Sequence, residues 1–110
     1  DATPYQRVLL AALVQVDVEP APKKNVLHLM NEIAKRRPKE GIDKKITGYD
    51  IAGARAGLKM RRKNLGKEDI IESGWDSRVG DYVYKIKDNY KQIVMDWIKN
   101  EGLWIKEEIS

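Results

Sequence analysis

Long basic side chains in the middle of the sequence are its clearest candidates for binding chemistry. Residues 35–67 contain twelve bases and three acids, a net charge of +9, whereas the other residues contain nine bases and fourteen acids, a net charge of −5. This asymmetry predicts a polyanionic partner, because Lys and Arg bond to phosphate oxygens and base edges. The residues predicted to bind nucleic acid are Arg36, Arg37, Lys44, Lys45, Arg55, Lys59, Arg61, Arg62 and Lys63.

Four of these cations are spaced to share one face of a helix around residues 50–63. At 100° per residue, one arc of that helix is apolar and contains Ile51, Ala54, Leu58 and Leu65. The adjoining arc is basic and contains Arg55, Lys59, Arg62 and Lys63. Two small residues, Ala52 and Ala56, lie in or beside the basic arc, where they would allow a DNA groove to approach closely.

The position of each cation on this face predicts its role. Arg55 and Lys59 are central and are predicted to contact base edges, whereas Arg62 and Lys63 are predicted to contact phosphates. Replacing both central residues by Glu is therefore predicted to abolish DNA binding with little change in melting temperature.

A solvated basic surface is an equally simple explanation of this helix taken alone. Gly53 and Gly57 also weaken the helix, because glycine costs about 1 kcal/mol relative to alanine in a helix interior. The two glycines either permit close packing against another helix or interrupt the segment. The charge excess of the surrounding residues is what favours a binding surface.

Few residues could perform catalysis or bind a metal. His28 is the only histidine and there is no cysteine, which excludes a multi-histidine or thiolate metal site. His28 points away from the apolar stripe of its segment, which predicts a surface residue. The acidic residues at 68–72 lack an accompanying Glu-x-Lys pattern, and no Gly-x-x-x-x-Gly-Lys phosphate loop occurs. We therefore expect no enzymatic activity, no metal and no cofactor.

Local signals predict a mainly α single domain over residues 1–110, with a small β-hairpin. Thr3, Pro4 and Gln6 are typical of a helix start. A proline-containing connector at residues 17–24 follows, and Asn25 is predicted to cap a second helix. Later segments predict a helix over 49–64, strands near 69–73 and 81–86, a helix over 89–100, and a final strand or docked tail at 103–105.

The order of the later elements resembles the winged-helix arrangement, a variant of the helix-turn-helix. A basic helix is followed by a possible strand at 69–73, a turn, the strand Asp81–Ile86 and a C-terminal helix, so the resemblance covers roughly residues 47–100. It implies that the basic helix binds DNA with the hairpin, the wing, beside it. The expected wing tip, residues 76–80, contains a single base, Arg78.

The aromatic residues are predicted to be mainly structural. The chain has no Phe, so Trp and Tyr must supply the aromatic part of the core, and Tyr90 and Trp97 lie at core positions of their helix. Trp75 is the exception, because it falls in the turn-rich segment and is the aromatic residue most suited to external contact. Stacking on unpaired bases is one such contact.

Two functions remain open on the sequence. The first is an intracellular module, in the cytoplasm, nucleus or nucleoid, that binds nucleic acid, with double-stranded DNA favoured over RNA. The second is a protein-interaction module of the inhibitor, immunity or adaptor type, whose basic patch docks on an acidic protein. A homodimer is also possible, because residues 5–16 form an unusually broad apolar helix face. We expect no membrane association, since the longest apolar run, Val8–Val14, has seven residues.

Overall fold

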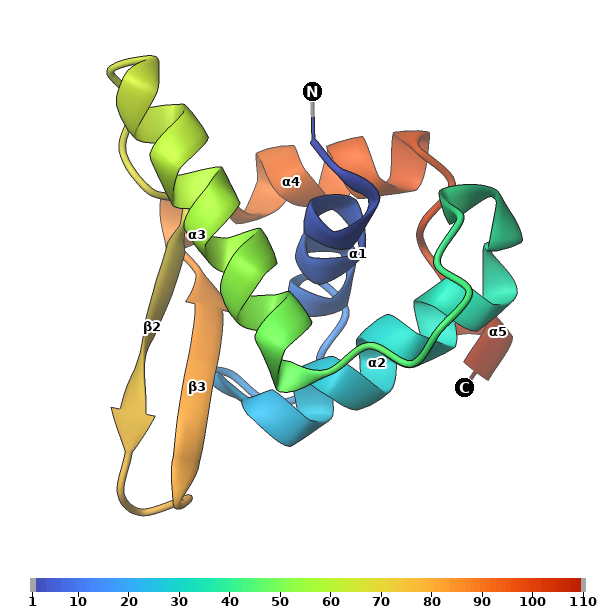
Figure 1. Ribbon diagram of the computed structural model, residues 1–110, viewed down its shortest axis with the longest axis horizontal. Coiled ribbons are helices and arrows are strands. Elements are labelled where there is room, and N and C mark those ends of the chain that lie inside the picture. Colours follow the sequence, from blue (N-terminus) through green and yellow to red (C-terminus); the bar gives the residue numbers. More distant parts are fainter. Residues whose placement is uncertain (1, 110) are drawn as a thin grey trace.

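Helix α1 (Pro4–Leu13) lies at the centre of the fold, and the other main helices pack around it (Figure 1). In this computed structural model, which describes residues 2–109, the chain forms one mostly helical α/β domain of five helices and a three-stranded antiparallel sheet. The remaining elements are β1 (Ala21–Pro22), α2 (Lys23–Arg36), a single 3-10 turn at Pro38–Glu40, α3 (Gly48–Asn64), β2 (Ile71–Asp76), β3 (Asp81–Ile86), α4 (Asp88–Asn100) and α5 (Lys106–Ile109).

Burial of α1 explains its broad apolar surface. Every residue from Val8 to Leu13 is buried, and contacts come from α2, α3, α4 and β3 of the same chain. The predicted helix start is confirmed, since Thr3 and Gln6 form a capping box and Pro4 occupies the first turn. The apolar face that suggested a homodimer is therefore covered from within the chain.

The predicted hairpin is present and joins a third short strand. Strands β2 and β3 pair in antiparallel register, with Ile71 opposite Ile86 and Trp75 opposite Tyr82. The first strand of the hairpin runs to Asp76, three residues beyond the sequence prediction. Strand β1, inside the proline-containing connector, pairs with the other edge of β3 and gives the order β1-β3-β2. Only two residues form β1, too few to produce a hydrophobic pattern.

Helices α2 and α3 lie on either side of the loop that contains Lys44 and Lys45, and the start of α2 differs from its prediction. Helix α2 begins at Lys23, directly after Pro22, so the prediction that Asn25 caps it is wrong. Pro22 leads into the helix with an extended backbone and no side-chain cap. Helix α3 is continuous from Gly48 to Asn64, because a capping box of Thr47 and Asp50 fixes its start and neither internal glycine interrupts it.

The C-terminal segment is a docked tail and not a strand. Leu103 and Ile105 are buried in the core. The buried Gln15 side chain accepts hydrogen bonds from the backbone N–H groups of Ile105 (2.7 Å) and Lys106 (3.1 Å), and donates to the carbonyl of Leu103 (3.0 Å). None of the helices described over residues 2–109 is long and apolar enough to cross a membrane.

Candidate functional site

Two of the nine predicted binding residues hold the C-terminal tail in place. Arg37 donates hydrogen bonds to the carbonyls of Gly102 (2.6 Å) and Trp104 (3.1 Å) and forms an ion pair with Glu108. The adjacent Arg36 pairs with Glu32 (3.4 Å) and lies 3.8 Å from Glu108. Both arginines are at the C-terminal end of α2, on the side of the molecule away from α3 (Figure 1).

Arg55, predicted to contact base edges, is instead bound to the hairpin. Its Nη1 lies 2.6 Å from a carboxylate oxygen of Asp69, and its Nη2 donates to the carbonyl of Ile71 (2.9 Å). Its Nε donates to the hydroxyl of Ser73 (3.3 Å). The structure thus argues against the expectation that replacing Arg55 leaves the melting temperature unchanged, because the change would remove a contact between α3 and β2.

The cations in the last turns of α3 are only partly available. Arg62 donates to the carbonyl of Glu68 (2.5 Å), and its guanidinium lies 5.2 Å from the centre of the Tyr90 ring. Arg61 and Lys63 form no ion pair with any residue in the described range 2–109. Lys63 is the more exposed of these two, so it keeps its predicted position on the outer surface.

The exposed lysines are the cations that remain available on this side of the molecule. Lys59 lies on the outer face of α3, and Lys44 and Lys45 lie in the loop before it. All three are exposed and have no ion pair among the described residues. The nine predicted residues therefore do not form one patch, because Arg36 and Arg37 lie at the end of α2 that is away from α3 (Figure 1).

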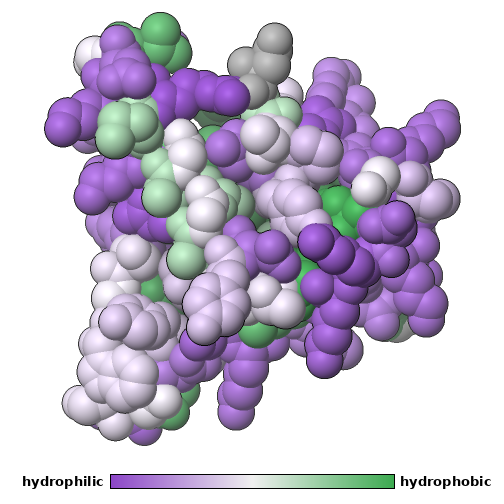
Figure 2. All heavy atoms as spheres, in the orientation of Figure 1, coloured by the Kyte–Doolittle hydropathy of each residue, from purple (hydrophilic) through white to green (hydrophobic). Residues whose placement is uncertain are grey.

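Three small residues are exposed on the outer face of α3, beside the larger Tyr49 and Met60. Ala52, Gly53 and Ala56 are exposed, and a Cβ added at Gly53 would meet no atom within 4 Å. In Figure 2, white and pale green residues follow the course of α3, with hydrophilic residues on both sides. Gly57 has the opposite role, because a Cβ there would lie 2.6 Å from the side-chain nitrogen of Gln6 on α1.

A groove of about 900 Å³ separates the first half of α3 from the sheet. Its cations are Lys23, Lys59 and Arg55, of which Arg55 is bound to the hairpin. The side-chain nitrogen of Lys23 lies 3.7 Å from the position of a Cβ built on Gly48. Tyr49, in the first turn of α3, is 91% exposed and also lines the groove. Tyr82 contributes from the sheet side. The groove is thus bounded by two lysines and by aromatic rings from two different elements.

An aromatic pair extends the groove toward the end of the hairpin. Trp75 and Tyr82 face each other across the two strands, with ring centres 5.5 Å apart and planes at 82°. Trp75 is 59% exposed and Tyr82 is 49% exposed. The same sheet face carries the buried Tyr84 nearer the core, and burial raises the pKa of its hydroxyl above the ordinary value.

The tip of the hairpin has a net negative charge. Residues 76–81 contain two acids and one base. The base, Arg78, pairs with Asp76 (3.3 Å), and hydrogen bonds from Arg78 hold the pKa of that carboxyl below its ordinary value. The second acid, Asp81, accepts a hydrogen bond from the backbone N–H of Lys24 (3.3 Å). The single cation of the tip is thus exposed but paired with a carboxylate of the tip.

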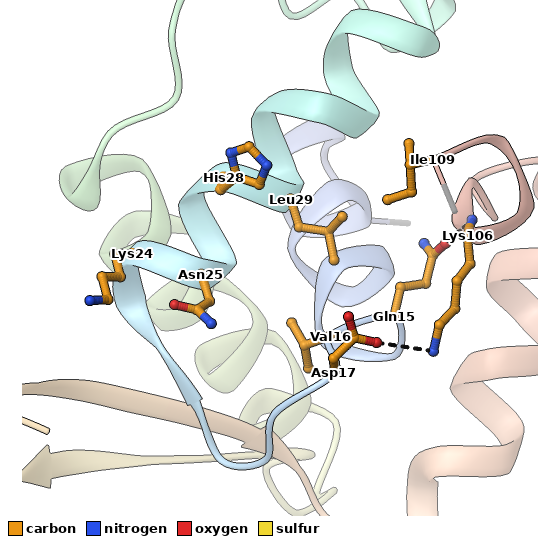
Figure 3. A pocket seen from close by; sticks show the side chains of 9 residues that line it. All are labelled: Gln15, Val16, Asp17, Lys24, Asn25, His28, Leu29, Lys106 and Ile109. Atoms are coloured by element: carbon orange, nitrogen blue, oxygen red, sulfur yellow. Dashed lines mark hydrogen bonds and ion pairs between the residues drawn. The ribbon is translucent and has the colours of Figure 1, made fainter.

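A second hollow of about 610 Å³ lies where the end of α1, the first half of α2 and α5 meet (Figure 3). His28 lines it and is exposed, which confirms its predicted surface position. Of its other polar groups, Gln15 holds the tail and Lys106 lies 3.6 Å from Asp17, while Lys24 and Asn25 line the hollow from α2. No group of three potential metal ligands occurs among residues 2–109.

Comparisons with protein-family models, with curated proteins and with solved structures found no significant match. The α3 surface, the groove and the hairpin together form the candidate site. Sequence reasoning missed Lys23 and Tyr49 as members of this site. Lys23 stood in an apparent connector far from the basic segment, and Tyr49 looked like an ordinary residue of a helix start.

Proposed function

We propose that the chain is a winged-helix-type module that binds nucleic acid, with double-stranded DNA as the favoured ligand. Helix α3 is the recognition helix and the β2–β3 hairpin is the wing. The observation that carries the proposal is the outer face of α3, where small residues at 52, 53 and 56 are exposed between available lysines. A module of this kind acts inside the cell, in the cytoplasm, nucleus or nucleoid.

Close approach is the physical reason for this assignment. The major groove of DNA admits an α-helix, and short side chains let the helix backbone approach the base edges. Lys59 and Lys63 stand on that exposed surface, and Lys23 adds a cation at the start of the helix. The hairpin extends past the first turn of α3 (Figure 1), as a wing beside a recognition helix does.

The type of cation favours binding to phosphates over sequence readout. Arginine recognises guanine through two parallel hydrogen bonds, whereas lysine acts as a compact point charge. Arg55 is bound to the hairpin and Arg62 donates to the carbonyl of Glu68, so the exposed cations of α3 are Lys59 and Lys63. We therefore propose binding of modest sequence specificity, with affinity for random duplex of roughly 10⁻⁴ to 10⁻⁶ M at physiological salt.

Two double variants with the same loss of charge test this function. Lys59→Gln with Lys63→Gln removes two cations from α3, whereas Lys35→Gln with Lys39→Gln removes two exposed cations near the far end of α2. Fluorescence anisotropy with a labelled blunt duplex should show weaker binding for the first variant and near-wild-type binding for the second. Equal losses would mean that only net charge matters, and the absence of binding by the wild type would contradict the proposal.

Exposed apolar side chains favour protein binding as a second candidate function. Tyr49 and Met60 on α3 and Trp75 on β2 are all exposed, and aromatic residues and Met are enriched at the centres of protein interfaces. The partner would be an acidic protein surface that the lysines approach. Stoichiometric co-purification with one protein, together with no anisotropy change on any nucleic acid, would favour this second function.

A further inference from the structure

The outer half of the hairpin exposes aromatic rings on the side of the sheet that faces α3. Its exposed side chains on the α3 side are the rings of Trp75 and Tyr82, which continue the line of buried residues on that sheet face. The hairpin extends past the first turn of α3 (Figure 1), and about half of each ring is exposed. The two rings form an exposed apolar surface. Their relative position is fixed because Trp75 and Tyr82 are directly opposite each other in the β2–β3 pairing.

The charges around these rings restrict where a nucleic acid backbone can lie. Asp76 and Asp81 give the tip a net negative charge, because Arg78 is the only base there and it pairs with Asp76. A duplex that continued past the tip would bring its phosphates toward these carboxylates, and like charges repel. On the inner side of the rings, Lys23 and Lys59 line the same groove as Tyr82. Phosphates are therefore attracted to the inner end and repelled at the outer end.

We propose that the preferred ligand is a duplex that opens or ends at the hairpin, with an unpaired base stacked on the Trp75–Tyr82 pair. The backbone of that unpaired strand lies along the groove, beside Lys23 and Lys59. This inference rests on the proposed function and specifies its substrate class, a junction between double-stranded and single-stranded nucleic acid. Because stacking uses the π-face that every base has, the preference is for structure and not for sequence.

The geometry of the pair suits stacking. The two rings meet edge to face at 82°, so the pair packs within itself and still leaves more than half of Trp75 open to a ligand. One base stacked on an aromatic side chain contributes about 1–3 kcal/mol, which corresponds to roughly 5- to 150-fold in affinity. A tailed duplex should therefore bind more tightly than a blunt duplex of the same sequence by a factor in that range.

The test compares two ligands and three proteins. The ligands are a blunt duplex and the same duplex with a single-stranded thymidine tail, each with a fluorescent label for anisotropy. The proteins are the wild type, Trp75→Leu and Trp75→Phe. Leucine keeps an apolar side chain on β2 but removes the π-face, whereas phenylalanine keeps a smaller π-face. Circular dichroism and thermal melting of each variant show whether the hairpin change has affected folding.

The expected result is a preference for the tailed duplex that Trp75→Leu abolishes and Trp75→Phe largely keeps, with blunt-duplex affinity unchanged in both. Val79→Ala, at another exposed position of the hairpin turn, should leave the preference intact. Equal affinity of the wild type for the two ligands, or a preference that survives Trp75→Leu, would overturn this inference and leave the proposed function standing. Failure of the wild type to bind either ligand would overturn both.

Discussion

The cations at the C-terminal end of α2 and those on the outer face of α3 have opposite surroundings. At the first site, Arg37 bonds to two carbonyls of the tail and to Glu108, and Arg36 pairs with Glu32. At the second, Lys59 and Lys63 are exposed and have no ion pair within residues 2–109. Both sites belong to the same basic stretch of sequence.

The difference follows from the chemistry of the two side chains. A guanidinium offers five N–H donors in a planar fork and can bridge carbonyls and carboxylates at once, whereas an ammonium is a strongly hydrated point charge. Arg7 shows the same behaviour, since it bonds to Glu40 and Glu101 and lies 5.7 Å from the centre of the Trp97 ring. Most arginines of this protein therefore connect elements, whereas the lysines on and before α3 are exposed and without an ion pair among residues 2–109.

The largest predicted effect is the loss of Arg7. Replacing it by Met leaves Glu40 and Glu101 without their partner, and all three side chains are less than one-third exposed. We expect the free energy of unfolding in urea to fall by about 2–3 kcal/mol. Lys63→Met is the matched control, because it removes the same charge from an exposed position and should change stability by less than about 0.5 kcal/mol. Similar losses of unfolding free energy in both variants would contradict the view that Arg7 is structural and Lys63 is not.

Replacement of Arg55 tests whether a cation on α3 is structural. Arg55→Met removes the ion pair with Asp69 and the bond to Ile71, so the free energy of unfolding should fall by about 1–2 kcal/mol. Lys59→Met, one turn further along the same helix, should leave stability nearly unchanged and weaken DNA binding more. The reverse pattern, a stable Arg55 variant with lost binding, would restore Arg55 as a direct DNA contact.

Alanine substitutions at the two glycines of α3 compare the effect of packing, at Gly57, with the effect of helix propensity, at Gly53. Gly57→Ala places a methyl group 2.6 Å from the Gln6 side chain, which also forms the capping box of α1, so we expect a loss of about 1 kcal/mol. Gly53→Ala meets open space and should instead stabilise the protein by up to about 1 kcal/mol. Urea unfolding of both variants measures these changes. An increase in the free energy of unfolding for Gly57→Ala would show that the Gln6 side chain can move away from the added methyl group.

Acid sensitivity of the tail is the smallest predicted effect. Hydrogen bonds from Arg37 hold the pKa of Glu108 below its ordinary value, so this carboxylate stabilises the fold above the ordinary pKa and loses that contribution as the pH falls through the lowered one. Glu108→Gln should be slightly less stable than the wild type at neutral pH and should approach it under acid conditions. Parallel stability curves from neutral to acid pH would exclude a role for this ion pair.

Sequence reasoning captured the elements with strong local signals. The capping box at Thr3, the basic helix over 49–64 and the hairpin all follow from short-range chemistry, and the structure contains them. It also placed Leu65 in the apolar arc, yet that residue is 65% exposed because the helix ends just before it and the chain turns at Gly66.

The partners of individual charges could not be predicted from sequence. Arg37 and Glu108 are 71 positions apart, and Arg55 meets Asp69 only because the chain folds back after α3. Periodicity assigns a residue to a face, but the choice between solvent and a distant carboxylate depends on tertiary structure. The segment carrying the site was therefore predictable, whereas the distinction between its structural arginines and its available lysines was not.

The salt dependence of binding to a blunt duplex tests the central claim most directly. If Lys23, Lys59 and Lys63 each neutralise a phosphate, the logarithm of the binding constant should fall with the logarithm of salt concentration with a slope of roughly −3. Lys59→Gln with Lys63→Gln should reduce the steepness by about 2, whereas Lys35→Gln with Lys39→Gln should leave the slope unchanged. A flat salt response of the wild type would contradict the account.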